Sequence, residues 1–371
     1  MKHEYEAIVI GAGPAGAACG ITLQKSGITN CVIDKAVFPR SKTCAGLVTG
    51  KTYKLIEQLF DNEVDDGIFC AVSSEVRLFS KTELLTAAPI TNPVRLVNRI
   101  DFDNALVKRY ISLDGKLFQG ERSYTIDYKK SCITLSNGDV LCGKTLIFAD
   151  GTLSQAHKLI DVPRERLAFG VEAYVPSSVI STKSVDLYFD YLDNGYVWVF
   201  PHGNTVCVGA ANQYNKNDDY IKVLSGVLSD LGAKDCNVKN IGAFLPYGYV
   251  VPQNKLPQNV LLTGDAGGFA DPISGEGLYM SMKTGILAAE AVKSGKPKEA
   301  YLKSVKPLQQ IIRDGKKMQK LFYKPSIHQK LFRKVKGNRR FVTFYFDNQV
   351  DEYRYTYRQM SKLYKEYKKT K

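Results

Sequence analysis

Three glycines near the start of the chain have the spacing of a phosphate-binding turn. Gly11, Gly13 and Gly16 follow the apolar run 7–10 and precede a helical segment that extends to Gly27. The first glycine permits a tight turn, the second lets a pyrophosphate approach the backbone, and the third lets the helix pack on the strand. The free N–H groups at the start of such a helix favour phosphate oxygens.

The next element completes a dinucleotide-binding unit. The segment NCVIDK predicts a second strand that ends at Asp34, whose carboxylate would accept hydrogen bonds from a ribose. A glycine motif between a strand and a helix, with an acid after the next strand, indicates dinucleotide binding more strongly than the glycines alone. This unit does not separate FAD from NAD, and a glycine-rich turn without a ligand is the structural alternative.

Two later segments each end an apolar strand with an aspartate beside a glycine. One strand stops at Asp150-Gly151, and another stops at Gly264-Asp265, before a turn-rich loop and a helix that starts near 275–277. Because ligands bind at the carboxyl edge of a parallel sheet, we expect both pairs to line one nucleotide site. The later helix start would again direct N–H groups at an electron-rich group.

The stretch YVWVFPHG contains the only tryptophan of the chain. Strand alternation predicts that Tyr196, Trp198 and Phe200 share one face and that two valines share the other. One interpretation is an ordinary core strand, since aromatic residues are common in strands. The other interpretation is an aromatic wall built for an apolar ligand.

Composition is typical of a globular protein of 371 residues, with 44% hydrophobic residues and no apolar run long enough to span a membrane. No signal peptide is evident, so we expect a cytoplasmic protein. The eight cysteines include no CxxC pair, which favours reduced thiols over a disulfide frame. The cysteines and the four histidines also predict no metal site.

The positive charge lies in the C-terminal part of the chain. Residues 296–371 hold 22 Lys/Arg against 6 Asp/Glu, whereas the rest is close to neutral. Five residues at helical spacing form one face near the end: Tyr353, Tyr357, Met360, Tyr364 and Tyr367. The helix packs on the body with a solvated basic face, or it contacts anionic lipid headgroups at the inner face of a membrane. Nucleic-acid binding is not expected, because no recognised nucleic-acid-binding signature accompanies the basic residues.

Several of these motifs resemble those of flavoprotein reductases of the geranylgeranyl reductase family, within the p-hydroxybenzoate hydroxylase structural group. The resemblance covers about residues 5–295 and includes GAGPAG, VFPRSKTCAG, NRIDFDNAL, ADGTLS and GDAGGFADP. The aromatic stretch is similar to the family's lipid-facing motif Tyr-x-Trp-x-Phe-Pro, seven intervening residues and Gly-x-Gly, in which Gly209 takes the place of the first of the two glycines. Ala211 and Ala45 stand where many relatives have glycine.

The resemblance implies an α/β fold with a discontinuous Rossmann-like FAD-binding domain formed by residues 1–65, 92–165 and 258–296. An antiparallel β-sheet substrate domain would comprise 66–91 and 166–257, followed by a basic C-terminal helical region, 297–371. No second GxGxxG occurs. We therefore expect NAD(P)H or a protein electron donor to bind only transiently.

The implied activity is reduction of carbon–carbon double bonds in a prenyl or isoprenoid lipid, by hydride transfer from flavin N5. Cys44 and Tyr196 are candidate catalytic residues beside the ring. The expected substrate-binding residues are Tyr196, Trp198, Phe200, Pro201 and Gly209. The expected cofactor-binding residues are Gly11, Gly13, Ala15, Gly16, Asp34, Lys35, Arg40, Cys44, Ala45, Gly46, Arg99, Asp150, Gly151, Gly264, Asp265, Gly275, Glu276, Gly277 and Leu278. The alternatives are an FAD-dependent aromatic monooxygenase or halogenase, and a non-catalytic flavin- or lipid-binding peripheral membrane protein.

Overall fold

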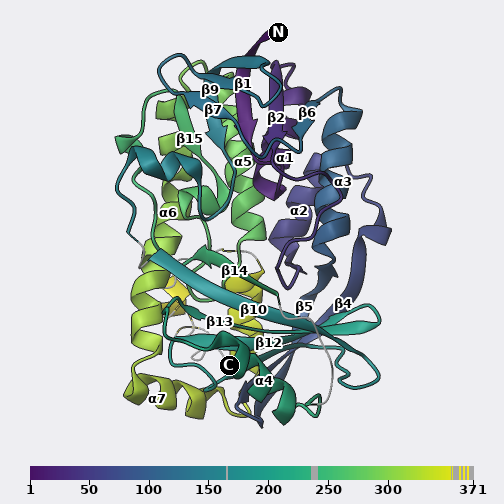
Figure 1. Cartoon of the computed structure of the whole chain (residues 1–371). Helices are drawn as coiled ribbons and strands as arrows, with labels where there is room; N and C mark the ends of the chain where they lie inside the picture. The colour runs from purple at the N-terminus through teal and green to yellow at the C-terminus, as the bar shows by residue number, and fades with distance from the viewer. Residues whose placement is uncertain are drawn as a thin grey trace.

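Two β-sheets and the helices packed on them make up the protein. The computed structural model describes residues 1–163, 166–234 and 241–351, and the single positions 353, 359, 360, 362, 363 and 366. Figure 1 shows the first sheet, with β1, β2 and β9, at the top and the second sheet, with β10, β12 and β13, at the bottom. Helix α6 runs along one side of the molecule and connects the two levels.

The first sheet has a parallel centre, as expected for a dinucleotide-binding fold. Its spatial order is β6 (Lys116–Gln119), β2 (Asn30–Asp34), β1 (Lys2–Ile10), β9 (Val140–Phe148), β8 (Cys132–Thr134) and β7 (Thr125–Asp127), with β15 (Val260–Leu262) also paired to β9. The pairs of β1 with β2 and β9, of β2 with β6, and of β9 with β15 are parallel. The carboxyl ends of these strands therefore share one edge, where the glycine turn and both aspartate pairs lie.

Helices cover the first sheet through close backbone contact. They are α1 (Pro14–Lys25), α2 (Gly50–Leu59), α3 (Arg99–Ser112), α5 (Leu278–Lys293) and α6 (Pro297–Phe322). Glycines allow α1 and α5 to meet: a Cβ at Gly285 would lie 2.1 Å from the carbonyl oxygen of Ala15. The hydrophobic core between these helices and the sheet includes Phe102 and Tyr301, both fully buried.

The second sheet is larger and not wholly antiparallel. Its order is β14 (Ile241–Pro246), β10 (Leu167–Pro176), β13 (Thr205–Gln213), β12 (Gly195–His202), β11 (Val185–Phe189), β4 (Phe69–Ser80), β5 (Glu83–Val97) and β3 (Leu47–Val48). The β4–β11 pair is parallel, because the chain leaves the sheet after β5 and re-enters it far later. The other pairs are antiparallel, as the sequence predicted.

Most of the expected domain limits fall close to the end of a helix or strand. One limit is an exception, because it divides β5. This strand continues to Val97 in the second sheet, whereas the expected limit lies between 91 and 92. β3 also pairs with β5 although it was assigned to the first domain. The second sheet thus includes residues on both sides of the expected limits, and the division into domains stays a prediction.

The C-terminal region packs on one face of the second sheet, while α4 (Tyr220–Asp230) covers the other. It contains α7 (Pro325–Val335), α8 (Arg339–Tyr345) and a π-helical turn, Phe346–Val350. Asp351 anchors its end, since its carboxylate accepts the Gly50 N–H of α2 at 2.5 Å and the Asn92 amide at 2.8 Å. Of the tyrosine face predicted for the tail, Tyr357, Tyr364 and Tyr367 lie outside the described residues.

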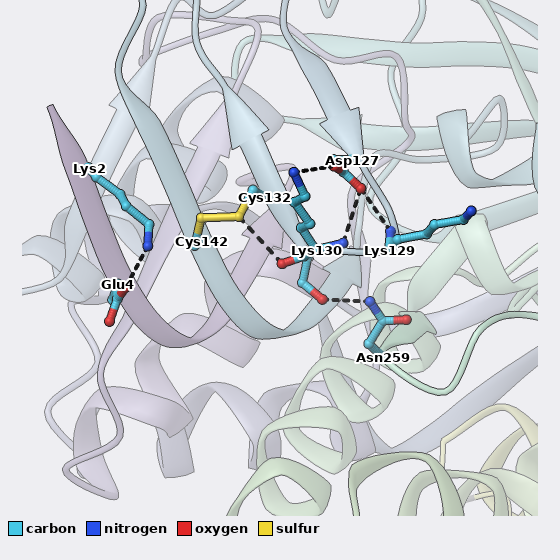
Figure 2. The surroundings of a disulfide bond; sticks show 9 residues. Lys2, Glu4, Asp127, Lys129, Lys130, Cys132, Cys142 and Asn259 are labelled. Atoms are coloured by element: carbon cyan, nitrogen blue, oxygen red, sulfur yellow. Dashed lines mark hydrogen bonds and ion pairs between the residues drawn. A yellow bond between two sulfur atoms is a disulfide. The ribbon is translucent and has the colours of Figure 1, made fainter.

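One cysteine expectation was wrong. Cys132 and Cys142 form a disulfide between paired positions of β8 and β9, as Figure 2 shows. A separation of 10 residues in sequence gives no motif, but the hairpin register brings the two Cα atoms to 4.1 Å. The other described cysteines with an assigned state, including Cys44 and Cys207, are free thiols. No helix within the described ranges is long and apolar enough to cross a membrane.

Candidate flavin and substrate site

The β1–α1 turn has the close backbone approach that the sequence predicted. Gly11 has φ +104°, and a Cβ there would lie 2.4 Å from the carbonyl oxygen of Ala149. A Cβ at Gly16 would lie 1.7 Å from the Gly11 oxygen, so the helix touches the turn directly. Asp34 sits at this turn, because its Oδ2 accepts the Ala12 N–H at 2.6 Å.

Arg40 lies beside the same turn and fits an anionic group. Its Nη2 is 3.3 Å from the position of a Cβ on Gly13 and 3.0 Å from Asp103 Oδ2. Its Nη1 is buried and has no hydrogen-bond partner in the described part of the chain. An unpartnered guanidinium nitrogen beside a glycine turn and a helix N-terminus suits a diphosphate such as that of FAD. Among the other expected contacts here, Ala15 is buried in α1 and Lys35 is exposed.

The two aspartate pairs reach the carboxyl edge of the sheet, as expected. Thr152 donates a hydrogen bond from Oγ1 to Asp265 Oδ2 at 3.3 Å, which joins the two segments. Burial raises the pKa values of Asp265 and Asp150 above the ordinary range. Gly264 and Gly151 both have positive φ, at +55° and +86°, which explains the glycine beside each aspartate.

The Cys44 loop crosses from the first sheet to the second. Gly46 has φ +72°, and a Cβ there would lie 2.1 Å from the Val97 oxygen. The backbone of Ala45 does not have a positive φ, so an alanine fits where many relatives have glycine. The Cys44 N–H donates to Glu172 Oε1 at 2.9 Å, and the Arg99 guanidinium lies against the Cys44 thiol. Arg99 is therefore placed beside Cys44.

The aromatic residues of β12 do share one face. Val197 and Val199 pack in the core with α4, whereas Trp198 and Phe200 pack on the opposite side of the sheet. Tyr196 and Trp198 are T-shaped neighbours with ring centroids 6.1 Å apart. The Tyr196 hydroxyl donates to the carbonyl oxygen of Ser274, and burial raises its pKa. One end of the wall therefore meets the loop before α5, which holds the expected residues Gly275, Glu276 and Gly277, with Leu278 buried behind them.

Small residues let the indole lie flat on the neighbouring strand. A Cβ on Gly209 would lie 2.2 Å from Cζ2 of Trp198, so only glycine leaves room for this ring position. Ala211 replaces the second glycine of the motif without a clash. Ala211 pairs with Gly170 on the neighbouring strand β10. Even a Cβ added to Gly170 would remain 3.5 Å from the Ala211 Cβ.

The far end of the aromatic face is covered by the C-terminal helices. Phe200 is 5% exposed and clusters with Val335, Val342 and Phe346. Pro201 is also buried in the strand. The aromatic face thus extends from the loop before α5 to the C-terminal helices, which pack against its far end.

Sequence reasoning missed a buried ion pair next to this loop. Lys51 Nζ lies 2.7 Å from Glu276 Oε2, with the two side chains 5% and 7% exposed. Tyr353, a singly described position after Asp351, has its ring centroid 4.1 Å from the same ammonium, and its hydroxyl donates to Asp271 Oδ2 at 3.1 Å. No sequence spacing links Lys51 with Tyr353, so only the fold could have shown this contact.

Sequence reasoning also missed Glu172. It is fully buried in β10, within the apolar segment LAFGVEAYVP. A single acid inside an apolar strand was a signal available in the sequence, because such a group is costly to bury without hydrogen bonds.

Comparisons with known proteins agree with this geometry. A family model described as an FAD binding domain matches residues 4–59. An uncharacterized protein of Methanosarcina barkeri is 31% identical over 296 residues, 78% of this chain and 75% of the relative. A geranylgeranyl diphosphate reductase of Rhodobacter capsulatus is 27% identical over 321 residues, 81% of this chain and 78% of that protein. The chain belongs to the geranylgeranyl reductase family of FAD-dependent oxidoreductases.

Solved structures show the same fold. A geranylgeranyl bacteriochlorophyll reductase-like protein from Thermoplasma acidophilum has a TM-score of 0.79, with 17% identity, over 91% of this chain and 92% of its own. The fold extends beyond reductases of this family. A probable FAD-dependent monooxygenase from Pseudomonas aeruginosa has a TM-score of 0.70, with 16% identity, over 90% of this chain and 99% of its own.

Proposed function

We propose that this family member reduces carbon–carbon double bonds of a prenyl lipid. The observation that carries the proposal is the aromatic face of β12, which starts at the loop before α5 and ends under the C-terminal helices. Two aromatic rings on an otherwise apolar wall suit a long hydrocarbon chain. A relative named as a geranylgeranyl diphosphate reductase supports the same substrate class.

The described residues fit FAD, and bound FAD would supply the hydride. Gly11, Gly13 and Arg40 would hold its diphosphate, and Asp34 would bind a ribose. Asp265 would bind the sugar-alcohol chain of the flavin half. An isolated alkene accepts hydride poorly, so alignment and exclusion of water carry much of the catalysis.

The chain's own residues would align the lipid and supply the proton. Tyr196 and Trp198, both half-buried, would hold the alkene against the ring site and limit the access of water to it. Cys44 lies on the loop between the two sheets and is the proposed proton donor to the second carbon. The electron donor to the flavin would be NAD(P)H or a redox protein that binds transiently.

The basic C-terminal region gives this proposal a membrane component. The segment 315–346 contains no acidic residue, and Lys330, Arg333 and Lys334 on α7 are exposed. Ile327, on the same helix, is 38% exposed. A basic surface with exposed aliphatic residues would bind anionic headgroups and bring the site to its lipid substrate.

Anaerobic single-turnover experiments test the reductase proposal. Flavin-loaded protein is reduced, mixed with geranylgeranyl diphosphate, and followed by flavin absorbance and product mass. We expect reoxidation and a gain of two hydrogens for each reduced bond. Trp198→Ala should slow reoxidation, whereas Tyr191→Ala, on the α4 side of the sheet, should not. If the flavin is reoxidised only by oxygen in the presence of an aromatic substrate, the result would favour a monooxygenase or halogenase. Lipid binding without turnover would favour a non-catalytic protein.

Vesicle sedimentation tests the membrane component. Protein should sediment with phosphatidylcholine vesicles that contain phosphatidylglycerol and remain in solution with phosphatidylcholine alone. The double variant Arg333→Glu/Lys334→Glu should lose this binding. Lys108→Glu, which removes an exposed lysine of α3, is the matched control. Equal binding by both variants would contradict the assignment of α7.

A further inference from the structure

Glu172 is a fully buried carboxyl group that lies next to the proposed proton donor. It is 0% exposed and points from the middle of β10 toward the Cys44 loop. Oε1 accepts the Cys44 N–H at 2.9 Å and the Tyr174 hydroxyl at 3.3 Å. Oε2 lies 3.8 Å from the Cys207 thiol.

These neighbours donate hydrogen bonds to Glu172, but none of them carries a positive charge that would balance a carboxylate. In the described part of the chain no cation forms an ion pair with it, and the nearest candidate, Arg99, is held by Asp103 at 2.7 and 2.9 Å. An unpaired carboxylate in an apolar interior is strongly disfavoured, and such groups take up a proton instead. Burial accordingly raises the pKa of Glu172 above its ordinary value.

The titratable groups around Glu172 come from four elements. Tyr174 shares β10, Cys207 faces it from β13, Cys44 from the loop and Arg99 from α3. His202 of β12 stacks edge-on against Tyr174, with centroids 5.1 Å apart, and burial lowers its pKa, so it adds no positive charge at neutral pH. Arg99 is thus the one permanent charge in this set.

We propose that Glu172 is the proton reservoir of this site, a neutral carboxylic acid that resupplies the proton delivered by Cys44. This inference rests on the proposed reductase function. It also explains why an acid is retained inside an otherwise apolar strand, directly beneath the loop that carries the thiol.

The step balances in atoms and electrons. The alkene π bond breaks as one carbon receives hydride from reduced flavin and the other receives the proton of the Cys44 thiol. The resulting thiolate takes the proton of Glu172, and the carboxylate is reprotonated by water when the product leaves. The two electrons come from NAD(P)H or the protein donor through the flavin. Glu172 acts through Cys44 and is a positioning and proton-storing residue.

Infrared spectroscopy of the protein without lipid tests the protonation state directly. The difference between wild type and Glu172→Gln at neutral pH should contain the carbonyl stretch of a protonated carboxylic acid, shifted in D₂O. Tyr174→Phe removes only a neighbouring hydroxyl and should keep this band. A difference spectrum that contains only ionised carboxylate bands would overturn the proposal, whether or not the protein reduces lipids.

Single-turnover rates test the role in proton supply. Glutamine keeps the acceptor for the Cys44 N–H but cannot supply a proton, so Glu172→Gln should slow lipid reduction about 100-fold. The wild-type rate should fall as pH rises through the pKa of Glu172. The variant should lack this inflection, and Glu172→Asp should restore part of the rate. A variant with weaker FAD binding but an unchanged pH profile would show a structural role and overturn the proposal. If wild type itself reduces no lipid, the proposed function fails instead.

Discussion

Gly209→Ala offers a sharp test of the aromatic wall. A Cβ at this position would lie 2.2 Å from Cζ2 and 2.3 Å from Cε2 of Trp198, where ordinary carbon contacts are near 3.4 Å or more. The indole must therefore leave the surface of β13. Overpacking of this kind costs about 1–3 kcal/mol of unfolding free energy. Alanine also reduces the conformational freedom of the unfolded chain, which offsets about 0.4–1 kcal/mol of this cost. We therefore expect the free energy of unfolding to fall by about 1–2 kcal/mol.

The assay benefits from the single tryptophan of the chain. Its fluorescence reports Trp198 alone, and the emission of Gly209→Ala should shift to the red as the ring moves toward water. Urea unfolding gives the change in stability. Gly226→Ala is the matched control, because nothing lies within 4 Å of that added Cβ on α4. It should gain about 0.5–1 kcal/mol with unchanged emission. Wild-type stability and emission in Gly209→Ala would refute the packing described for Trp198.

Three further predictions concern stability. Burial lowers the pKa of Lys298 from 10.5 to about 8. Between pH 8 and 10.5 the unfolded chain therefore keeps a proton on Lys298 that the native protein has lost. The free energy of unfolding should rise with pH over this range. The rise is at most about 3 kcal/mol, and urea titrations of Lys298→Met should lack it. Asp351→Ala removes the acceptor of the Gly50 N–H and should cost about 1–2 kcal/mol in the same assay. The Cys132→Ser/Cys142→Ser variant should lose about 2–3 kcal/mol, and reducing agent should destabilise wild type but not the variant.

The nucleotide half of the fold could be predicted because its signals are local. The glycine turn, Asp34 and the two aspartate pairs each follow a strand, and the parallel sheet brings such strand ends to one edge. The alternation of β12 was equally readable, since a period of two fixes which side chains share a face.

Other features depend on contacts between distant segments. The parallel β4–β11 pair and the continuation of β5 to Val97 follow from how the chain returns to the second sheet. The Cys132–Cys142 bond depends on hairpin register, which no cysteine motif encodes. The isolated acid Glu172 was visible in the sequence, but only the fold shows that it faces Cys44.

The placement of the C-terminal segment has a consequence for a shortened chain. Asp351 and Tyr353 lie near the end of a chain of 371 residues, yet they fasten the start of α2 and the loop that meets Tyr196. Residues far along the chain therefore complete the surroundings of the aromatic face. A chain that stops before α7 would keep every nucleotide motif but lose Val335, Val342 and Phe346, and Phe200 would then be exposed to water.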